Sequence, residues 1–300
     1  MKPNWIAVDW GSTNLRAWAM YDNKLLGEAF SEEGIGKLSA KEFEPALLRL
    51  ILPWLTEETI HVIACGMVGS RQGWQEAPYC AVPCRPVGKS TLVTLASTDH
   101  RILVKVTSGL KQNLPADVMR GEETQIAGAL ALYPDFEGVF CLPGTHSKWV
   151  KVKAGQVISF HTFMTGEIFS LLSTASVLRH SVAEKGWNNA AFDQGVKIAL
   201  AKPQTISKQL FKLRSESLIG DLNADCARAR LSGLLIGIEL AAIKSYLKNQ
   251  SLAIIGSHHL TENYASAMDH LGLRYSRLDA TQCTISGLYA AREAQQKEVK

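Results

Sequence analysis

Short apolar segments alternate with polar turns along the first part of the chain. Three apolar segments of strand length occupy residues 4–9, 15–21 and 24–30. Short apolar runs bounded by turn residues predict β-strands. Residues 39–51 begin with a serine and carry apolar side chains at helical spacing, which predicts a helix. Residues 59–65 are a short apolar run and predict a further, buried strand.

The same order of elements returns in the second half. The first half ends with a strand over 101–108 and a helix over 121–133, and three consecutive strands then follow again at 137–142, 146–153 and 156–162. After these strands we expect mostly helices, over 165–173, 188–201, 204–214 and 221–248. The end of the chain should form a strand at 252–256, a helix from 258, a strand at 273–278 and a last helix from 281. A repeated supersecondary pattern indicates two similar α/β halves.

Residues 66–90 interrupt the first half. They are rich in Gly, Pro, Trp and Arg and show neither helical nor strand periodicity, so we expect a long irregular loop. Loops of this length within a compact domain are usually functional or disordered, and the aromatic content argues against disorder.

Composition excludes several classes of protein. The 300 residues are 46% hydrophobic, with a formal net charge of +4 and no run of five basic residues, so we expect no nucleic-acid partner. The apolar stretches are too short to span a bilayer and the N-terminus does not resemble a signal peptide, so we expect a cytoplasmic protein without membrane contact. The six scattered cysteines fit reduced, mostly buried thiols.

Two glycine and hydroxyl turns occupy equivalent places in the two halves. The first is Gly11-Ser12-Thr13-Asn14, directly after an apolar strand that ends in Asp9. The second, in "LPGTHSKWV", contains Gly144-Thr145-His146-Ser147-Lys148. Accessible backbone N–H groups beside hydroxyls bind phosphate, although either turn alone also fits an ordinary hairpin.

Two further segments of the chain contain glycine beside polar or charged residues. In "IIGSHHL" an apolar strand runs through Gly256 and Ser257 into a helix, a geometry that lets a phosphate or a flat ring approach the backbone. The "GIGK" segment at 34–37 lacks the third glycine of a dinucleotide fingerprint and does not predict such a site.

Together these elements resemble the nucleotide-binding motifs of the sugar kinase, actin and hsp70 superfamily. More narrowly, the chain resembles the bacterial 2-dehydro-3-deoxygalactonokinase family in the segments "AVDWGSTNLRAW", "GMVGSRQGWQEAPY", "MRGEETQIAGAL", "LPGTHSKWV" and "TFMTGEIFSLL". The resemblance covers essentially the whole chain, and the five segments in this order are specific.

The resemblance implies an α/β fold of two ribonuclease H-like domains of the actin and hexokinase type, with an interdomain nucleotide cleft. We expect an N-terminal domain at 1–134, completed by the helix 281–300, and a C-terminal domain at 135–280. It also implies an ATP- and Mg²⁺-dependent kinase that phosphorylates the terminal hydroxyl of 2-dehydro-3-deoxy-D-galactonate in galactonate catabolism. A small-molecule sugar acid is then the partner, and a homodimer is one alternative for the oligomeric state.

The resemblance also assigns roles to residues. Asp9 would hold Mg²⁺ directly or through water. The β- and γ-phosphates would contact Gly11, Ser12, Thr13, Asn14, Gly144, Thr145 and His146. Lys148 is either a counter-charge for the phosphates or a solvent-facing strand residue. Gly256 and Ser257 would contact the nucleoside.

A carboxylate is needed to orient the acceptor hydroxyl or to take its proton. Related sugar kinases use an Asp at the start of the helix before the second hairpin, and Glu122 stands at that position here. Glu123 and Asp117 are alternatives, and a pair of acidic residues at a helix start also complements the helix dipole without any catalytic role.

A 2-oxo acid requires a cationic partner, and the planar guanidinium of arginine suits a carboxylate. Arg71 is the first choice, with Gln72 and Trp74 beside it and Arg16 or Arg120 as alternatives. Trp74 would either stack on the carbon chain of the substrate or anchor the loop.

Two other functions stay open at this point. One keeps the fold but changes the acceptor to another sugar acid or a sugar. The other is a non-catalytic nucleotide-binding or chaperone-like module, against which the presence of Asp9 and Glu122 argues.

Overall fold

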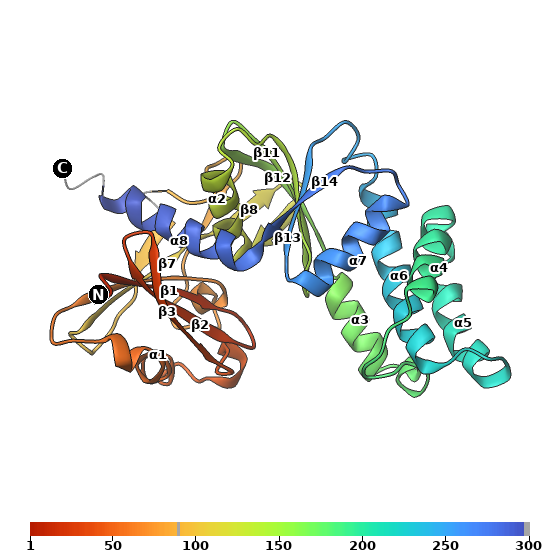
Figure 1. Cartoon of the computed structure of the whole chain (residues 1–300), viewed down its shortest axis with the longest axis horizontal. Helices are drawn as coiled ribbons and strands as arrows, with labels where there is room; N and C mark the ends of the chain where they lie inside the picture. Colours follow the sequence, from red (N-terminus) through yellow and green to blue (C-terminus); the bar gives the residue numbers. More distant parts are fainter. Residues whose placement is uncertain (89–90, 297–300) are drawn as a thin grey trace. The chain divides into compact units, whose positions relative to one another are not determined.

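Three β-sheets and eight α-helices make up the described part of the chain, residues 1–88 and 91–296 of a computed structural model (Figure 1). Backbone contacts divide the chain into two compact units. Unit 1 comprises Met1–Glu137, Lys151–Phe160 and Leu278–Lys300. Unit 2 comprises Gly138–Val150 and His161–Arg277.

The first half of the chain supplies two sheets and two helices. Its elements are β1 (Trp5–Trp10), β2 (Leu15–Tyr21), β3 (Lys24–Ser31), α1 (Phe43–Ile51), β4 (Ile60–Cys65), β5 (Tyr79–Ala81), β6 (Leu92–Thr94), β7 (Ile102–Thr107), β8 (Gly109–Asn113), β9 (Ala116–Met119) and α2 (Glu122–Leu132). The larger sheet has the order β3-β2-β1-β4-β7-β6, and the smaller sheet has the order β5-β8-β9. β1, β4 and β7 run parallel, so their carboxyl ends lie at one edge of the sheet.

The second half supplies one sheet and most of the helices. Its elements are β10 (Gly138–Leu142), β11 (Ser147–Lys153), β12 (Gln156–Phe163), α3 (Thr165–Thr174), α4 (Asn189–Ala201), α5 (Ile206–Ile219), α6 (Ala224–Ile243), β13 (Leu252–Gly256), α7 (His258–Asp269), β14 (Tyr275–Asp279) and α8 (Ala280–Gln296). The sheet order is β12-β11-β10-β13-β14. Helices α4 and α6 pack together along their lengths (Figure 1).

The large sheet of unit 1 is buried on both faces. Alternate residues of β1 point to opposite faces, and Ile6 and Val8 belong to a core cluster with Phe43 of α1. Trp5, on the other face, packs in a second cluster with Leu288 of α8. A helix therefore covers each face, and β1 lies in the centre of the unit with little freedom to move.

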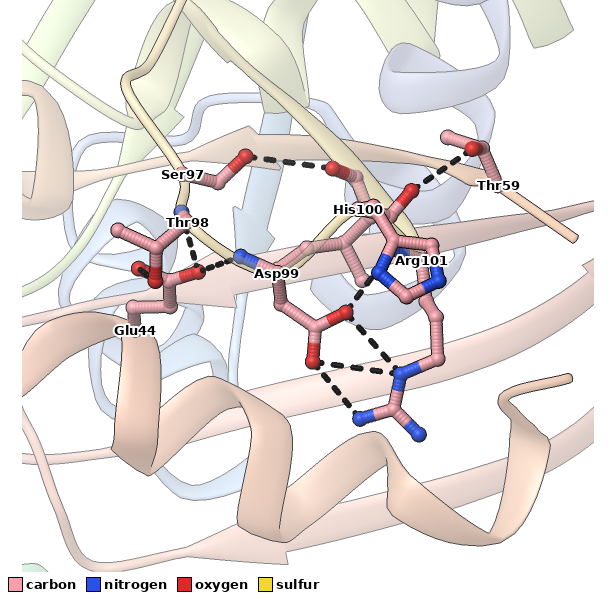
Figure 2. Close-up of polar contacts among 8 residues, drawn as sticks. Glu44, Thr59, Ser97, Thr98, Asp99, His100 and Arg101 are labelled. Carbon is pink, nitrogen blue, oxygen red and sulfur yellow. Dashed lines mark hydrogen bonds and ion pairs between the residues drawn. The ribbon is translucent and has the colours of Figure 1, made fainter. Parts of the chain in front are cut away.

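Polar contacts fix the start of β7 (Figure 2). The carboxylate of Glu44 in α1 accepts hydrogen bonds from the backbone N–H groups of Thr98 and Asp99, at 2.7 and 2.8 Å. Asp99 in turn accepts from Nε and Nη2 of Arg101, at 3.0 and 2.7 Å. The side-chain hydrogen bond from Arg101 lowers the pKa of Asp99 to about 2. These contacts tie α1 to the loop that leads into the parallel strands.

Most predicted elements are present, with several differences, one of which is that the helix predicted over 204–214 continues to Ile219. The region predicted as an irregular loop contains strand β5, and residues 66–88 of it lie within the described residues. Strands β6, β8 and β9 were not predicted. β8 lies between its hairpin partner β9 and β5, which precedes it by about thirty positions, and local periodicity carries no sign of the pairing with β5. The helix predicted over 221–248 ends at Ile243. The last four residues of the predicted helix 281–300 lie outside the described residues.

Within residues 1–88 and 91–296, no helix combines the length and the apolar character needed to cross a membrane.

Candidate active site

The central strand of unit 1, β1, carries a half-buried carboxylate, Asp9, one residue before its end. Its neighbours Val8 and Trp10 are buried, and the antiparallel register pairs Asp9 with Arg16 of β2. Nη2 of Arg16 donates to Oδ2 of Asp9 at 2.5 Å. The other carboxylate oxygen, Oδ1, lies 3.9 Å from Sγ of Cys65, at the end of the parallel strand β4. Arg16 thus contacts the predicted metal ligand directly and balances its charge.

The turn after Asp9, residues 11–14, is braced by the segment 34–36. Three backbone N–H groups of this segment donate to carbonyl oxygens of the turn, at 3.0 to 3.1 Å. A Cβ atom on Gly34 would lie 2.2 Å from the carbonyl carbon of Thr13 and 2.4 Å from the carbonyl oxygen of Ser12, so only glycine permits this approach. The side chains of residues 12–14 are exposed. The "GIGK" segment therefore supports the predicted phosphate turn.

Two glycines bring the start of α2 to the end of β1. Gly66 has φ +93°, and a Cβ there would lie 2.8 Å from the carbonyl oxygen of Trp10 and 3.3 Å from Oδ1 of Asp9. Gly121 has φ +106°, and its Cβ would lie 3.3 Å from Cα of Gly66. Both positions favour glycine for conformational and steric reasons. Glu122, the first residue of α2, therefore lies at the same edge of unit 1 as Asp9.

Glu123 is fully buried and serves the structure of α2. Its Oε2 accepts from the backbone N–H of Gly121 at 2.6 Å, and its Oε1 accepts from the hydroxyls of Thr107 and Thr124 at 3.2 and 3.1 Å. Burial, and secondarily the charge of Glu122, raise the pKa of Glu123 to about 8. Glu123 has no exposed surface, which argues against a role as the base and favours Glu122 or Asp117.

The two other predicted bases are both half-buried. Glu122 accepts a hydrogen bond from the backbone N–H of Arg120 at 3.1 Å. Asp117 lies on β9, where its Oδ1 accepts from the backbone N–H of Val118 at 2.8 Å. Of the two, Glu122 directly follows Gly121, which packs on Gly66 at the end of β1 that carries Asp9.

The two arginines of this region differ in their surroundings. The side chain of Arg71 is 81% exposed, with Nε 3.6 Å from the carboxylate of Glu76. Arg120 is buried: its Nη2 donates to the carbonyl oxygen of Ala77 at 2.7 Å, and its guanidinium lies 4.3 Å from the ring centre of Tyr79. Arg120 fixes the loop, whereas Arg71 is accessible to a substrate.

Trp74 anchors the loop. Its ring lies 6.4 Å from that of Trp10, edge to face, and 6.5 Å from that of Phe43, nearly parallel. It packs against the main core of unit 1 and is half-buried. The adjacent Gln72 is exposed. The anchoring role that the sequence left open for Trp74 is therefore present.

Unit 2 carries the second predicted phosphate turn between β10 and β11. Thr145 and His146 are exposed at its tip. Lys148 is only 4% exposed, and its Nζ lies 3.4 Å from the carbonyl oxygen of His146. The alternative of a solvent-facing Lys148 is therefore wrong, since the strand turns this side chain inward, toward the backbone of the turn.

A buried carboxylate behind this turn was missed by the sequence analysis. Oε1 of Glu239, in the apolar helix α6, accepts from Nε1 of Trp149 at 2.7 Å. Its Oε2 accepts from the hydroxyls of Ser147 at 3.1 Å, Tyr264 at 2.8 Å and Thr165. Burial raises the pKa of Glu239, and the four hydrogen bonds oppose that shift. Through these four hydrogen bonds the carboxylate of Glu239 links β11, α3 and α7.

The predicted nucleoside contacts, Gly256 and Ser257, connect β13 to α7. A Cβ on Gly256 would lie 3.5 Å from Cδ of Pro143, so this connection passes close to the start of the β10–β11 turn. A cavity of about 150 Å³ opens nearby in unit 2. Its lining includes Gly144, Phe169, Trp187, Arg228, His259 and Asn263.

The arrangement defines a class of protein. Each unit presents an exposed glycine turn suited to phosphate, and unit 1 adds two carboxylates beside its turn. Such groups position and neutralise phosphates, which is most of what phosphoryl transfer requires of a protein. The fold is that of the actin, hsp70 and sugar kinase class, and the arrangement of these groups points to a kinase.

Comparison with known proteins identifies the family. The sequence profile described as 2-keto-3-deoxy-galactonokinase matches residues 9–291. The chain is 36% identical over 296 residues to a probable 2-dehydro-3-deoxygalactonokinase of Rhizobium meliloti, with 96% of each chain covered. It is also 36% identical to the 2-dehydro-3-deoxygalactonokinase of Escherichia coli, with 91% of each covered. The chain belongs to the 2-keto-3-deoxy-galactonokinase family.

Comparison with solved structures supports the same family. A Sinorhizobium meliloti protein described as a candidate 2-dehydro-3-deoxygalactonokinase superposes with a TM-score of 0.90 at 35% identity, over 97% of this chain and 96% of that one. A component of the (R)-2-hydroxyglutaryl-CoA dehydratase of Acidaminococcus fermentans has a TM-score of 0.54 at 11% identity, with 99% of each chain covered, and shares the fold alone. The predicted family, fold class and enzyme class, a phosphotransferase with an alcohol acceptor, are confirmed.

Proposed function

We propose that the chain transfers the γ-phosphoryl group of ATP to the terminal hydroxyl of 2-dehydro-3-deoxygalactonate, the substrate named for its relatives. Family membership supports the reaction. One structural observation carries the assignment of residues: Asp9, the exposed turn that follows it and Glu122 share one edge of unit 1.

The phosphates of ATP would be bound by the two glycine turns. Backbone N–H groups and hydroxyls of residues 11–14 act from unit 1, and Gly144, Thr145 and His146 act from unit 2. Lys148 adds positive charge behind the second turn. The structure supports this proposal because the tips of both turns are exposed while their backbones are held by neighbouring segments.

Asp9 fits a magnesium site. Mg²⁺ binds proteins through one or two carboxylates and keeps several waters, and Asp9 supplies one half-buried carboxylate at a strand end. Its Oδ2 is shared with Arg16, and its Oδ1 lies toward the small residue Gly66. When bound, the ion would neutralise part of the charge on the transferring phosphate.

The acceptor would be oriented by Glu122. In the proposed step the terminal hydroxyl oxygen bonds to the γ-phosphorus, the bond to the β-phosphate oxygen breaks, ADP leaves, and Glu122 takes the hydroxyl proton. Arg71 would pair with the carboxylate of the acceptor, because it is exposed where Arg120 is buried. Gln72 and Trp74 lie beside it.

The nucleoside would lie in unit 2. Gly256 and Ser257 precede α7, and the nearby cavity offers the aromatic side chains of Trp187 and His259 together with polar groups. Flat apolar surfaces with a few polar atoms suit a purine ring.

The test is acceptor-dependent release of ADP from MgATP. The panel contains 2-dehydro-3-deoxygalactonate, gluconate analogues, neutral hexoses and amino sugars. We expect turnover with the 2-oxo acid, loss of at least about a hundredfold in kcat for Glu122→Gln, and retained turnover for Glu123→Gln. The second variant is the matched control, since it alters the adjacent but buried carboxylate.

The outcomes separate the alternatives. Turnover only with a neutral sugar would change the acceptor and remove the role of Arg71. ATP binding without turnover on any acceptor would favour a non-catalytic module. Full activity of Glu122→Gln together with loss in Asp117→Asn would move the base to β9.

A further inference from the structure

The start of α3 packs directly on the second phosphate turn. A Cβ on Gly166 would lie 2.4 Å from the carbonyl oxygen of Gly144 and 2.9 Å from Cα of Thr145, so glycine is required for this contact. The backbone N–H of Glu167 donates to the carbonyl oxygen of Thr145 at 2.9 Å. The motif "TFMTGEIF" thus has a structural partner, although nothing in the proposed reaction uses it.

A pair of side chains also connects the turn to the start of α3. Nε2 of His146, at the tip of the turn, lies 2.5 Å from Oε2 of Glu167. The two side chains are 47% and 37% exposed, so the pair lies at the surface rather than in the core. The stability of this pair therefore depends on how firmly the backbones of the turn and of the α3 start are held.

Both backbones are anchored to the same buried group. Ser147, the residue after His146, donates to Oε2 of Glu239 at 3.1 Å. Thr165, two residues before Glu167, donates to the same oxygen. The turn and the helix start are therefore fixed on either side of one carboxylate, and His146 and Glu167 face each other across a preset distance.

We propose that Glu167 is a positioning residue that holds the His146 ring in place for contact with the phosphates of the nucleotide. The inference rests on the proposed role of His146. The chemical reason is preorganisation: a ring with Nε2 engaged by Glu167 has lost most of its rotational freedom before ATP binds, and its other nitrogen, Nδ1, is left for the ligand. Ordering one side chain on binding typically costs enough to weaken affinity about three- to tenfold.

The experiment is a double-mutant cycle on the full chain. Steady-state kinetics are measured for the wild type, His146→Ala, Glu167→Ala and the double variant, with MgATP and the acceptor varied separately. We expect each single variant to raise KM for ATP about three- to tenfold. KM for the acceptor and kcat should change less than about twofold, and the double variant should bind ATP no worse than His146→Ala.

Two further variants separate positioning from stability. Glu167→Gln keeps a hydrogen-bond acceptor for Nε2 and should restore part of the affinity. Glu216→Ala removes another partly exposed, ion-paired glutamate of unit 2, which bonds Lys212 of α5 and Arg230 of α6, and should leave KM for ATP unchanged. Circular dichroism confirms that each variant is folded.

Additive effects of the two alanine variants would overturn the proposal, since Glu167 would then act independently of His146. An unchanged KM for ATP in Glu167→Ala would also overturn it. If the wild type shows no acceptor-dependent turnover, the proposed reaction fails, and the same cycle is measured by calorimetric binding of MgADP. Coupling between the two residues in that binding supports the inference, and additivity refutes it.

Discussion

Glu123→Gln tests the electrostatics of the candidate site most sharply. Glu123 lies under the α2 start with no exposed surface, and burial raises its pKa from an ordinary 4.5 to about 8. At neutral pH the folded chain therefore carries a proton on this residue. Glutamine has the same shape and mimics the protonated form, because its amide donates to the threonine hydroxyls where the carboxylic acid would.

The sign of the effect follows from proton binding. Below about pH 4.5 the residue is protonated in both the folded and the unfolded chain and contributes no pH dependence. Between that pH and about 8 the unfolded chain loses its proton while the folded chain keeps it, so the free energy of unfolding falls as the pH rises. Above about 8 the loss is complete.

The magnitude is large enough to measure. A shift from 4.5 to about 8 corresponds to a loss of about 3 kcal/mol in the free energy of unfolding between about pH 5 and pH 8. Glutamine does not titrate and escapes this loss. For a unit of this size 1 kcal/mol changes Tm by about 2–4 °C, so the variant should gain roughly 6–12 °C on the wild type over that interval.

Differential scanning calorimetry of both proteins at several pH values provides the measurement. Glu58→Gln, which alters an exposed carboxylate of unit 1, is the control and should melt parallel to the wild type at every pH. Parallel melting curves for wild type and Glu123→Gln would refute the reasoning, because they would mean that Glu123 is ionised in the folded chain. Loss of acceptor-dependent turnover in the variant would contradict its assignment as a structural residue.

Two further predictions concern the first phosphate turn. Asp9→Asn should lower kcat at least about a hundredfold, because it removes the proposed metal ligand. Its Tm should change little, since the lost pair with Arg16 is partly exposed; wild-type turnover in this variant would remove Asp9 from the mechanism. Gly34→Ala should raise KM for ATP at least about tenfold, because the new methyl group overlaps the backbone of Thr13. Gly88→Ala is its control, because the added Cβ has no atom within 4 Å among the described residues other than its chain neighbours, and equal KM values for the two would show that the brace is dispensable.

Local sequence predicted the parts of the site that lie next to each other in the chain. Asp9 and the turn after it follow a run of apolar residues, and that pattern alone indicates a strand end with polar groups. The second turn could be predicted in the same way. In both cases the signal spans fewer than ten residues, so no knowledge of the tertiary structure is needed.

The parts that the sequence left unpredicted depend on distant partners. Glu239 interrupts an apolar helix, and its partners Ser147 and Thr165 precede it by 92 and 74 positions. A lone acidic residue in such a segment is the available signal, because an unpaired carboxylate is rarely buried. The direction of the Lys148 side chain stayed open for a related reason: strand alternation gives the direction of a side chain only when the covered face is known.

The two phosphate turns are supported by the same physical device, although the supporting segments share no sequence. In unit 1 the segment that contains Gly34 donates backbone N–H groups to the turn, and in unit 2 the backbone N–H beside Gly166 does so. Every one of these bonds uses a carbonyl oxygen of the turn, so none of them consumes a turn N–H that a phosphate would need. A glycine is required in each brace because the two backbones approach more closely than a Cβ allows. The bracing therefore stiffens each turn without using any N–H group of the turn, and it accounts for glycines that lie outside the turns themselves. Within the first turn only the N–H of Gly11 is seen to donate to the turn itself, at 3.0 Å to the carbonyl oxygen of Asn14.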